Sequence, residues 1–193
     1  MRLCLRAAAA ALLATTSAGP ALAQQAGITY DCDTASGNFS ELVLPAPPTP
    51  FTVSGHVRLN KIAKIDKFAP LTRLTISGPS ARPGETPADW AGFEITALPA
   101  KALARQIRTD KEVLQFLSWA EMAGGDKKAH DPSGPLDYPD SLSFTLSYDG
   151  SSVSARIAGQ EQKMAMPARN PVVRIVCSTG EFLFTDLTIA AGR

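Results

Sequence analysis

Apolar and polar residues alternate with a period of two along several parts of this chain, and that spacing restricts them to half-buried β-strands. In 51–59, Phe, Val and Leu residues fall on one side of an extended chain, while Thr, Ser, His and Arg fall on the other. The pattern returns in 142–148, and the Asp149-Gly150 dipeptide that follows is typical of a hairpin turn. The chain is therefore predicted to be mostly antiparallel β-structure.

Further strands are expected wherever β-rich segments are bounded by turn residues. They are predicted at 71–77, 90–98, 153–157, 172–177 and 182–189. The prolines of 45–50 form an extended connector, and Ser178-Thr179-Gly180 is expected to turn the chain. No fixed-period repeat is visible, so residues 24–193 are predicted to form one antiparallel β-sandwich domain.

One segment shows helical spacing instead. Thr109 to Glu112 fits a capping box, in which the threonine and glutamate side chains satisfy free backbone donors at a helix start. Apolar residues follow at helical intervals, and Gly124-Gly125 would end the helix. A short helical insertion is therefore predicted near 110–123, while 101–108 is compatible with either a helix or a strand.

The first 23 residues have the composition of a secretory signal peptide. Arg2 and Arg6 precede an alanine-rich apolar run, and residues 21–23 (Ala-Leu-Ala) match a signal peptidase site. The apolar run is short for a bilayer-spanning helix. We expect cleavage before Gln24, a periplasmic or secreted product, and no membrane anchor after cleavage.

Cleavage also changes the charge of the chain. The sequence has 19 Lys and Arg against 18 Asp and Glu, and loss of Arg2 and Arg6 leaves 17 against 18, a net charge near −1. Such a balance offers no basic surface for nucleic acid or for anionic lipid. A nucleic-acid partner is therefore not expected.

Two cysteines remain after Cys4 is removed with the leader. In an oxidising compartment, Cys32 and Cys177 are expected to form one disulfide, which is the only connectivity open to two cysteines. The bridge would close a loop of nearly the whole mature chain. In the chain-entropy model, such a closure stabilises the fold by about 4–5 kcal/mol.

The closing residues resemble the end of concanavalin A-like (laminin G-like) jelly rolls. The resemblance rests on the turn at 177–180, the strand Glu181 to Ile189 with its aromatic residues and Asp186, and the hairpin at Asp149-Gly150, within 141–189. It implies a two-sheet sandwich in which the first and last strands are neighbours in one sheet. That arrangement would let Cys32 meet Cys177.

The sequence gives no sign of a common catalytic site. It lacks the Glu-x-Asp-x-(x)-Glu run of glucanases with this fold, and Glu94 and Glu181 are interpreted as solvated side chains. It has only two histidines, His56 and His130, and no Gly-x-Ser-x-Gly motif. We therefore predict no catalytic residues.

Metal-binding patterns are equally weak. Zinc would need several His or Cys ligands at close spacing. Carboxylates from Asp126, Asp131, Asp137 and Asp140 could hold calcium, but the spacing fits no calcium loop and lysines lie among them. The segment is interpreted as a solvated acidic loop, and no cofactor is expected.

Candidate ligand-binding residues are aromatic side chains beside hydrogen-bonding groups, because a flat ring matches the apolar face of a sugar. Tyr138, flanked by Asp137 and Asp140, is the foremost candidate, and Trp90 is the second. Trp119 and Tyr148 are the other aromatic residues considered.

These observations favour an exported, non-catalytic binding protein whose ligand is a glycan or another protein. One alternative is a periplasmic enzyme inhibitor, because Tyr30-Asp31-Cys32 is similar to the Tyr-x-Cys segment of small bacterial lysozyme inhibitors. Another is a polysaccharide-active enzyme with dispersed site residues. The oligomeric state is left open.

Overall fold

The computed structural model describes residues 27–63, 68–82, 85–103, 107–128, 130, 135–136 and 141–192. The strands are β1 (Ile28–Pro45), β2 (Phe51–Ile62), β3 (Leu71–Ser77), β4 (Trp90–Pro99), β5 (Val113–Ala123), β6 (Asp126–Lys127), β7 (Pro135–Leu136), β8 (Leu142–Tyr148), β9 (Ser152–Ile157), β10 (Gln160–Ala165) and β11 (Val172–Ala191). A 3₁₀ turn, η1 (Ala100–Leu103), is the only helical element in these ranges. The mostly β class is confirmed.

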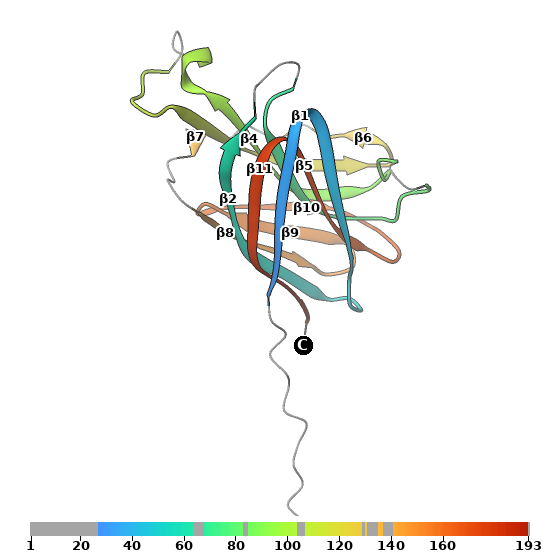
Figure 1. Ribbon diagram of the computed structural model, residues 1–193. Helices are drawn as coiled ribbons and strands as arrows, with labels where there is room; N and C mark the ends of the chain where they lie inside the picture. Colours follow the sequence, from blue (N-terminus) through green and yellow to red (C-terminus); the bar gives the residue numbers. More distant parts are fainter. Residues whose placement is uncertain are drawn as a thin grey trace, which may run out of the picture.

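The two longest strands, β1 and β11, each rise to the top of the molecule and turn back (Figure 1). Residues 172–178 of β11 pair with β3, whereas residues 180–191 pair with β2. β1 follows β11 through the same bend, pairing with its two halves through 39–45 and 28–34. Thr179 has a φ of 55° at the bend.

This shared bend divides one continuous antiparallel sheet into two stacked layers. The first layer has the strand order β10-β9-β8-β2, followed by the C-terminal half of β11 and the N-terminal half of β1. The second layer begins with the other halves of β1 and β11 and continues through β3, β4, β5 and β6, with β7 also paired to β5. The sandwich, with its first and last strands side by side, agrees with the prediction.

Aromatic side chains fill the space between the layers. Phe144 of the first layer lies 5.6 Å from Phe93 of the second, measured between ring centroids, and 6.1 Å from Phe184. All three are almost fully buried. The residues that alternate with them on each strand face outward, as expected for antiparallel sheets.

The disulfide joins the two layers beneath the bend. Cys32 lies opposite Phe182 in the first layer, and Cys177 lies opposite Ser40 in the second. Their Cα atoms are 6.2 Å apart, and both side chains are buried. The predicted Cys32–Cys177 bridge is therefore present in the structure.

The predicted helix at 110–123 is wrong, because most of this segment forms strand β5. β5 pairs with β4 along its full length, from Val113 opposite Pro99 to Met122 opposite Trp90. The hydroxyl of Thr109 accepts a hydrogen bond from the amide of Lys111 at 3.1 Å, forming a local turn rather than a helix cap. Pairing with a buried neighbouring strand outweighs the local helical spacing.

The glycines after this segment have a different role from the one predicted. Gly124 and Gly125 have φ values of 61° and 86° and turn the chain from β5 into β6. The undecided segment 101–108 contributes to η1, and its residues 107–108 are in neither helix nor strand. Strand β10 was not predicted.

The other turns follow the sequence more closely. The hairpin at Asp149-Gly150 is confirmed, with the Asp149 carboxylate accepting hydrogen bonds from the amides of Ser151 and Ser152 at 2.9 and 2.8 Å. The Ser152 hydroxyl, which donates to the other carboxylate oxygen at 2.6 Å, and these amides hold the pKa of Asp149 far below its ordinary value. At 178–180 the chain bends as predicted, although β11 continues through the bend as one strand.

Replacing Cys32 and Cys177 with alanine should lower the free energy of unfolding by about 5 kcal/mol in the chain-entropy model, because the bridge joins residues 145 positions apart. Urea titration of the oxidised protein and of the double variant measures the difference. Unchanged midpoints in the two proteins would show that the bridge does not constrain the fold.

Candidate functional site

A shallow groove crosses the outward face of the second layer, and we call it the open-face groove. It consists of two adjoining hollows of about 330 and 270 Å³ that share Trp90 in their linings. The first is lined by Phe39, Glu41, Arg73, Thr75, Glu85, Thr86, Pro87, Trp90, Arg174 and Val176. The second is lined by Trp90, Glu94, Ser118, Trp119, Ala120, Lys127, Lys128 and His130.

Small residues in the middle of this face form the floor of the groove. Gly92 lies between Thr75 of β3 and Ala120 of β5 in one cross-strand row. A Cβ atom at Gly92 would lie 2.1 Å from the carbonyl oxygen of Leu74, so glycine allows β3 and β4 to approach closely. Large side chains on either side of this row form the walls.

Arg73 and Glu94 form an ion pair across β3 and β4. Both Nε and Nη2 of Arg73 donate to Oε2 of Glu94, at 2.9 and 2.5 Å, and the guanidinium lies 4.7 Å from the ring centroid of Trp90. Nη1 of Arg73 and Oε1 of Glu94 have no hydrogen-bond partner in the described part of the chain. This pair therefore has one donor and one acceptor available for a ligand.

Arg174 joins three parts of the chain beside this pair. Its Nη1 donates to Glu41 of β1, and its Nη2 donates to the hydroxyl of Ser80. That hydroxyl in turn donates to the carbonyl of Glu85 at 2.7 Å, which holds the loop between β3 and β4 against the sheet. Arg174 is only 8% exposed, so it is a structural part of the groove.

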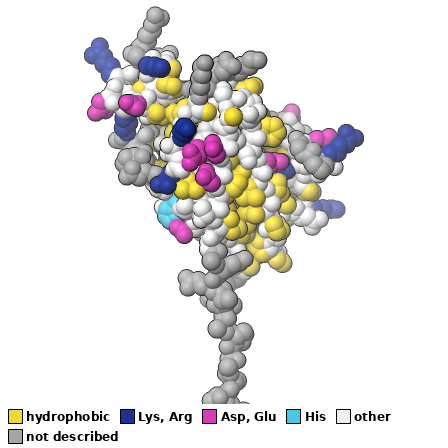
Figure 2. All heavy atoms as spheres, viewed as in Figure 1, with side chains coloured by type: hydrophobic (Ala, Val, Ile, Leu, Met, Phe, Trp, Pro, Cys, Tyr) yellow, Lys and Arg dark blue, Asp and Glu magenta, His cyan; other side chains and the backbone are white. Residues whose placement is uncertain are grey.

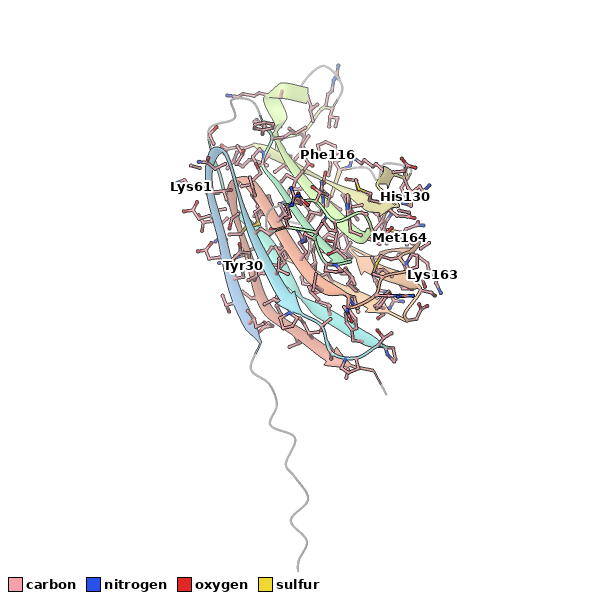
Figure 3. All side chains as sticks on the ribbon, turned by 90° about the vertical axis from the view of Figure 1, so that its right-hand side faces the viewer. Tyr30, Lys61, Phe116, His130, Lys163 and Met164 are labelled. Atoms are coloured by element: carbon pink, nitrogen blue, oxygen red, sulfur yellow. A yellow bond between two sulfur atoms is a disulfide. The ribbon has the colours of Figure 1, made fainter. Side chains whose placement is uncertain are left out.

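At the other end of the groove, His130 lines the second hollow and pairs with Glu121, which is not part of the lining. Nε2 of His130 lies 2.8 Å from Oε2 of Glu121, and both side chains are mostly buried. His130 lies on the far side of the molecule from Tyr30 of β1 (Figure 3). Lys127 and Lys128 line the same end.

The predicted ligand residues are only partly described. Trp90 lies in the groove, but its side chain is 4% exposed and its ring is covered by Arg73, so it is not an open stacking surface. Asp137, Tyr138 and Asp140 lie outside the described residues. Their assignment as ligand-binding residues stays a prediction.

Sequence reasoning missed Phe39, Arg73, Glu41 and Arg174. Phe39 is 69% exposed at the β1 end of the groove, in a polar segment for which no strand was predicted. The charged residues form pairs only because distant strands align, and one sequence does not reveal that alignment. Glu94, interpreted as a solvated side chain, is instead bound to Arg73.

Tyr30, the first residue of the segment that is similar to lysozyme inhibitors, makes contacts within the sandwich. Its ring centroid lies 6.4 Å from that of Phe184, and its hydroxyl is 2.8 Å from the Ser40 hydroxyl. Much of its surface is therefore used inside the sandwich.

The described residues contain no group of three or more His, Cys, Asp or Glu side chains that could hold a metal ion. Of the acidic loop considered for calcium, Asp131, Asp137 and Asp140 lie outside the described residues, and Asp126 is an exposed residue of β6. Within the same ranges, none of the helical structure has the length and hydropathy needed to cross a bilayer.

Figure 2 shows a separate strip of hydrophobic side chains on the lower part of the face that carries the bends of β1 and β11. A hollow of about 650 Å³ at the open end of the sandwich has an aliphatic lining that includes Ile28, Leu44, Leu187 and Ile189. It has few polar groups that could orient a ligand. The open-face groove is therefore the stronger candidate site.

No protein-family model matches the sequence, and no curated protein matches it either. Among solved structures, the carbohydrate binding module CBM66 from Bacillus subtilis is 7% identical, with a TM-score of 0.48 over 86% of this chain and 98% of that one. A functionally unknown protein from Saccharomyces cerevisiae is 9% identical, with a TM-score of 0.46 over 86% and 88% of the two chains.

A third match is CG-16, a homodimeric agglutinin from chicken liver. It is 12% identical, with a TM-score of 0.41 over 78% of this chain and 100% of that one. The antiparallel sandwich expected from the closing residues is the fold that the structure shows. At such low identities the similarity concerns the fold alone, and no residue role is transferred.

Replacing Glu41 with alanine should lower the free energy of unfolding by about 3 kcal/mol, because it leaves the buried Arg174 guanidinium without its carboxylate. Glu161→Ala is the matched control, since it breaks an exposed pair with Arg156 that should contribute less than about 1 kcal/mol. Urea titration of both variants checks the difference. Equal losses of unfolding free energy in the two variants would show that the buried pair contributes no more to stability than the exposed pair.

Proposed function

We propose that this protein is an exported, non-catalytic protein that binds a carbohydrate in the open-face groove. The observation that carries the proposal is the Arg73–Glu94 pair, in which one guanidinium nitrogen and one carboxylate oxygen have no partner in the described part of the chain. Both side chains are partly accessible, at 27% and 16%. They are therefore held in place and still able to bind a ligand.

Neighbouring hydroxyl groups of a sugar suit this arrangement chemically. A hydroxyl both donates and accepts hydrogen bonds, whereas guanidinium only donates and carboxylate only accepts. One hydroxyl can accept from Nη1 of Arg73 while the next donates to Oε1 of Glu94. Charge-assisted bonds of this kind are stronger than neutral ones and fix orientation as well as affinity.

The dimensions of the groove suit an oligosaccharide rather than a single sugar. The groove extends across five neighbouring strands from β1 to β5, or about 19 Å at the usual strand spacing of about 4.8 Å. An exposed aromatic side chain, Phe39 of β1, lies at one end of the groove. Its ring can pack against the apolar face of a sugar unit.

Export is part of the proposal. It is supported by the leader-like composition of residues 1–23 and by the buried bridge between Cys32 and Cys177, which requires an oxidising compartment. A glycan outside the cytoplasm is then the natural ligand class.

Glu94→Gln should weaken binding by at least about tenfold, because a hydrogen bond to a charged group contributes about 1.5–3 kcal/mol. The amide preserves the shape of the side chain and can still accept from Arg73. Screening the wild-type protein on a glycan array, followed by calorimetric titration of the best ligand, provides the measurement.

Glu161→Gln is the matched control, because Glu161 lies on β10 and forms an exposed pair with Arg156. It should bind as the wild type does. Failure of the wild type to bind any glycan would reject the proposal. Unchanged affinity of Glu94→Gln would show that the glycan binds elsewhere on the protein.

One observation favours a second candidate, a polysaccharide-active enzyme. The Glu121 carboxylate lies 2.8 Å from His130, and His130 shares its hollow with Glu94. A carboxylate that orients an imidazole is a common arrangement for proton transfer.

If the groove cleaves its ligand, His130→Ala should abolish cleavage while binding persists, and His56→Ala, on the exposed side of β2, should have no effect. Chain length of the bound polysaccharide, followed over time by size-exclusion chromatography, reports the reaction. Intact chains after prolonged incubation with the wild type would eliminate this candidate.

A further inference from the structure

The buried side-chain atoms that lack a hydrogen-bond partner gather on the face that forms the groove. Among the described residues they are Oγ of Ser77, Nε1 of Trp90 and Nε of Arg174. Ser77 and Trp90 are opposite each other on β3 and β4, and Arg174 lies on the next strand, β11. Two of these atoms can only donate, so this part of the groove has unused donors and needs an acceptor.

The pattern of bonds around Arg174 indicates which kind of acceptor fits. Nε and Nη2 lie along one edge of a guanidinium, which is one of the edges that binds a carboxylate through two parallel hydrogen bonds. In Arg174, Nη2 donates to the Ser80 hydroxyl and Nε has no partner, while Nη1 is occupied by Glu41. On this edge of Arg174, a neutral hydroxyl therefore binds Nη2 alone, where a carboxylate could bind both Nη2 and Nε.

The charges nearby are arranged consistently with this idea. Arg73 lies opposite Val176 and Arg174 lies opposite Thr75, so the two guanidinium groups are diagonal neighbours on adjacent strands. Glu41 of β1 and Glu94 of β4 flank the two arginines, and each is already bound to one of them. An anion placed between these two carboxylates would contact the guanidinium groups of Arg73 and Arg174 before it contacted a carboxylate.

We propose that the hollow between Arg174 and Trp90 is a subsite for the carboxylate of an acidic sugar, so that the ligand of the groove is a uronate-containing glycan. This inference rests on the proposed carbohydrate binding. The carboxylate accepts from Nε and Nη2 of Arg174 and displaces the Ser80 hydroxyl, which keeps its bond to the Glu85 carbonyl. Nε1 of Trp90, whose side chain lines the same hollow, supplies a further donor.

Access to the subsite depends on the Ser80 side chain. Nε of Arg174 is buried in the free protein, and the Ser80 hydroxyl occupies the neighbouring Nη2. Glu85 is an exposed rim carboxylate paired with Arg82 at 3.6 Å. The ligand therefore displaces the partly exposed Ser80 side chain and leaves the core intact.

The test uses short uronate oligosaccharides and their methyl esters, which have the same hydroxyl pattern and ring shape but no charge. For the wild type, calorimetric titration should give about tenfold tighter binding of the acid than of the ester, as expected for charge-assisted bonds. Arg174→Lys should remove most of this preference, because lysine lacks the two-donor edge. Trp90→Phe, which keeps a ring but removes Nε1, should reduce it by a smaller factor.

Arg156→Lys is the matched control for Arg174→Lys, because Arg156 is an exposed residue of β9. It should retain the full preference. Thermal unfolding of each variant identifies loss of fold, and in that event Trp90→Phe carries the test.

Equal binding of acid and ester by the wild type would overturn the acidic subsite and leave the proposed carbohydrate binding in place. An equal loss of both ligands in Arg174→Lys would also overturn it, since the arginine would then act only on the fold. Binding of neither these ligands nor any glycan on the array would reject the proposed function itself.

Discussion

The pairing of β1 with β11 through a common bend is the interaction on which the rest of the structure depends. β11 is hydrogen-bonded to β2 in one layer and to β3 in the other, so the bend at Thr179 sets how the two layers stack. β1 follows it on the other edge, and the Cys32–Cys177 bridge fixes the two strands just below the bend. Without this shared bend, the strands would form one open sheet with an exposed apolar face.

The groove is a consequence of the same bend. Because the C-terminal half of β1 continues into the second layer, Glu41 reaches Arg174 and Phe39 reaches the end of the face formed by β3, β4 and β5. The face then contains the Arg73–Glu94 pair beside a row of small residues centred on Gly92, and Arg174 lies at the β11 end of that row. A binding surface is thus assembled from segments that are distant in the sequence.

The distance in sequence between residues that pair in the fold explains which features could be predicted from the sequence. The strands at 51–59 and 142–148 were recognised because their apolar period is local, and the disulfide followed from the cysteine count. The helix expected at 110–123 failed because the spacing of Leu114 and Leu117 also fits a strand with one residue on each face, and the pairing with β4 decided the outcome. The site was missed because pairs such as Arg73–Glu94 exist only once β3 and β4 are aligned.

The polar side chains of this face also carry a cost in folding free energy. A sheet face optimised only for stability would leave few buried donors without acceptors, since each one carries a desolvation cost of about 1–3 kcal/mol. The three such atoms among the described residues, in Ser77, Trp90 and Arg174, nevertheless lie on neighbouring strands of this face, beside two ion pairs. A ligand rich in oxygen acceptors would recover that cost on binding, and its affinity would come partly from bonds that the free protein leaves unmade.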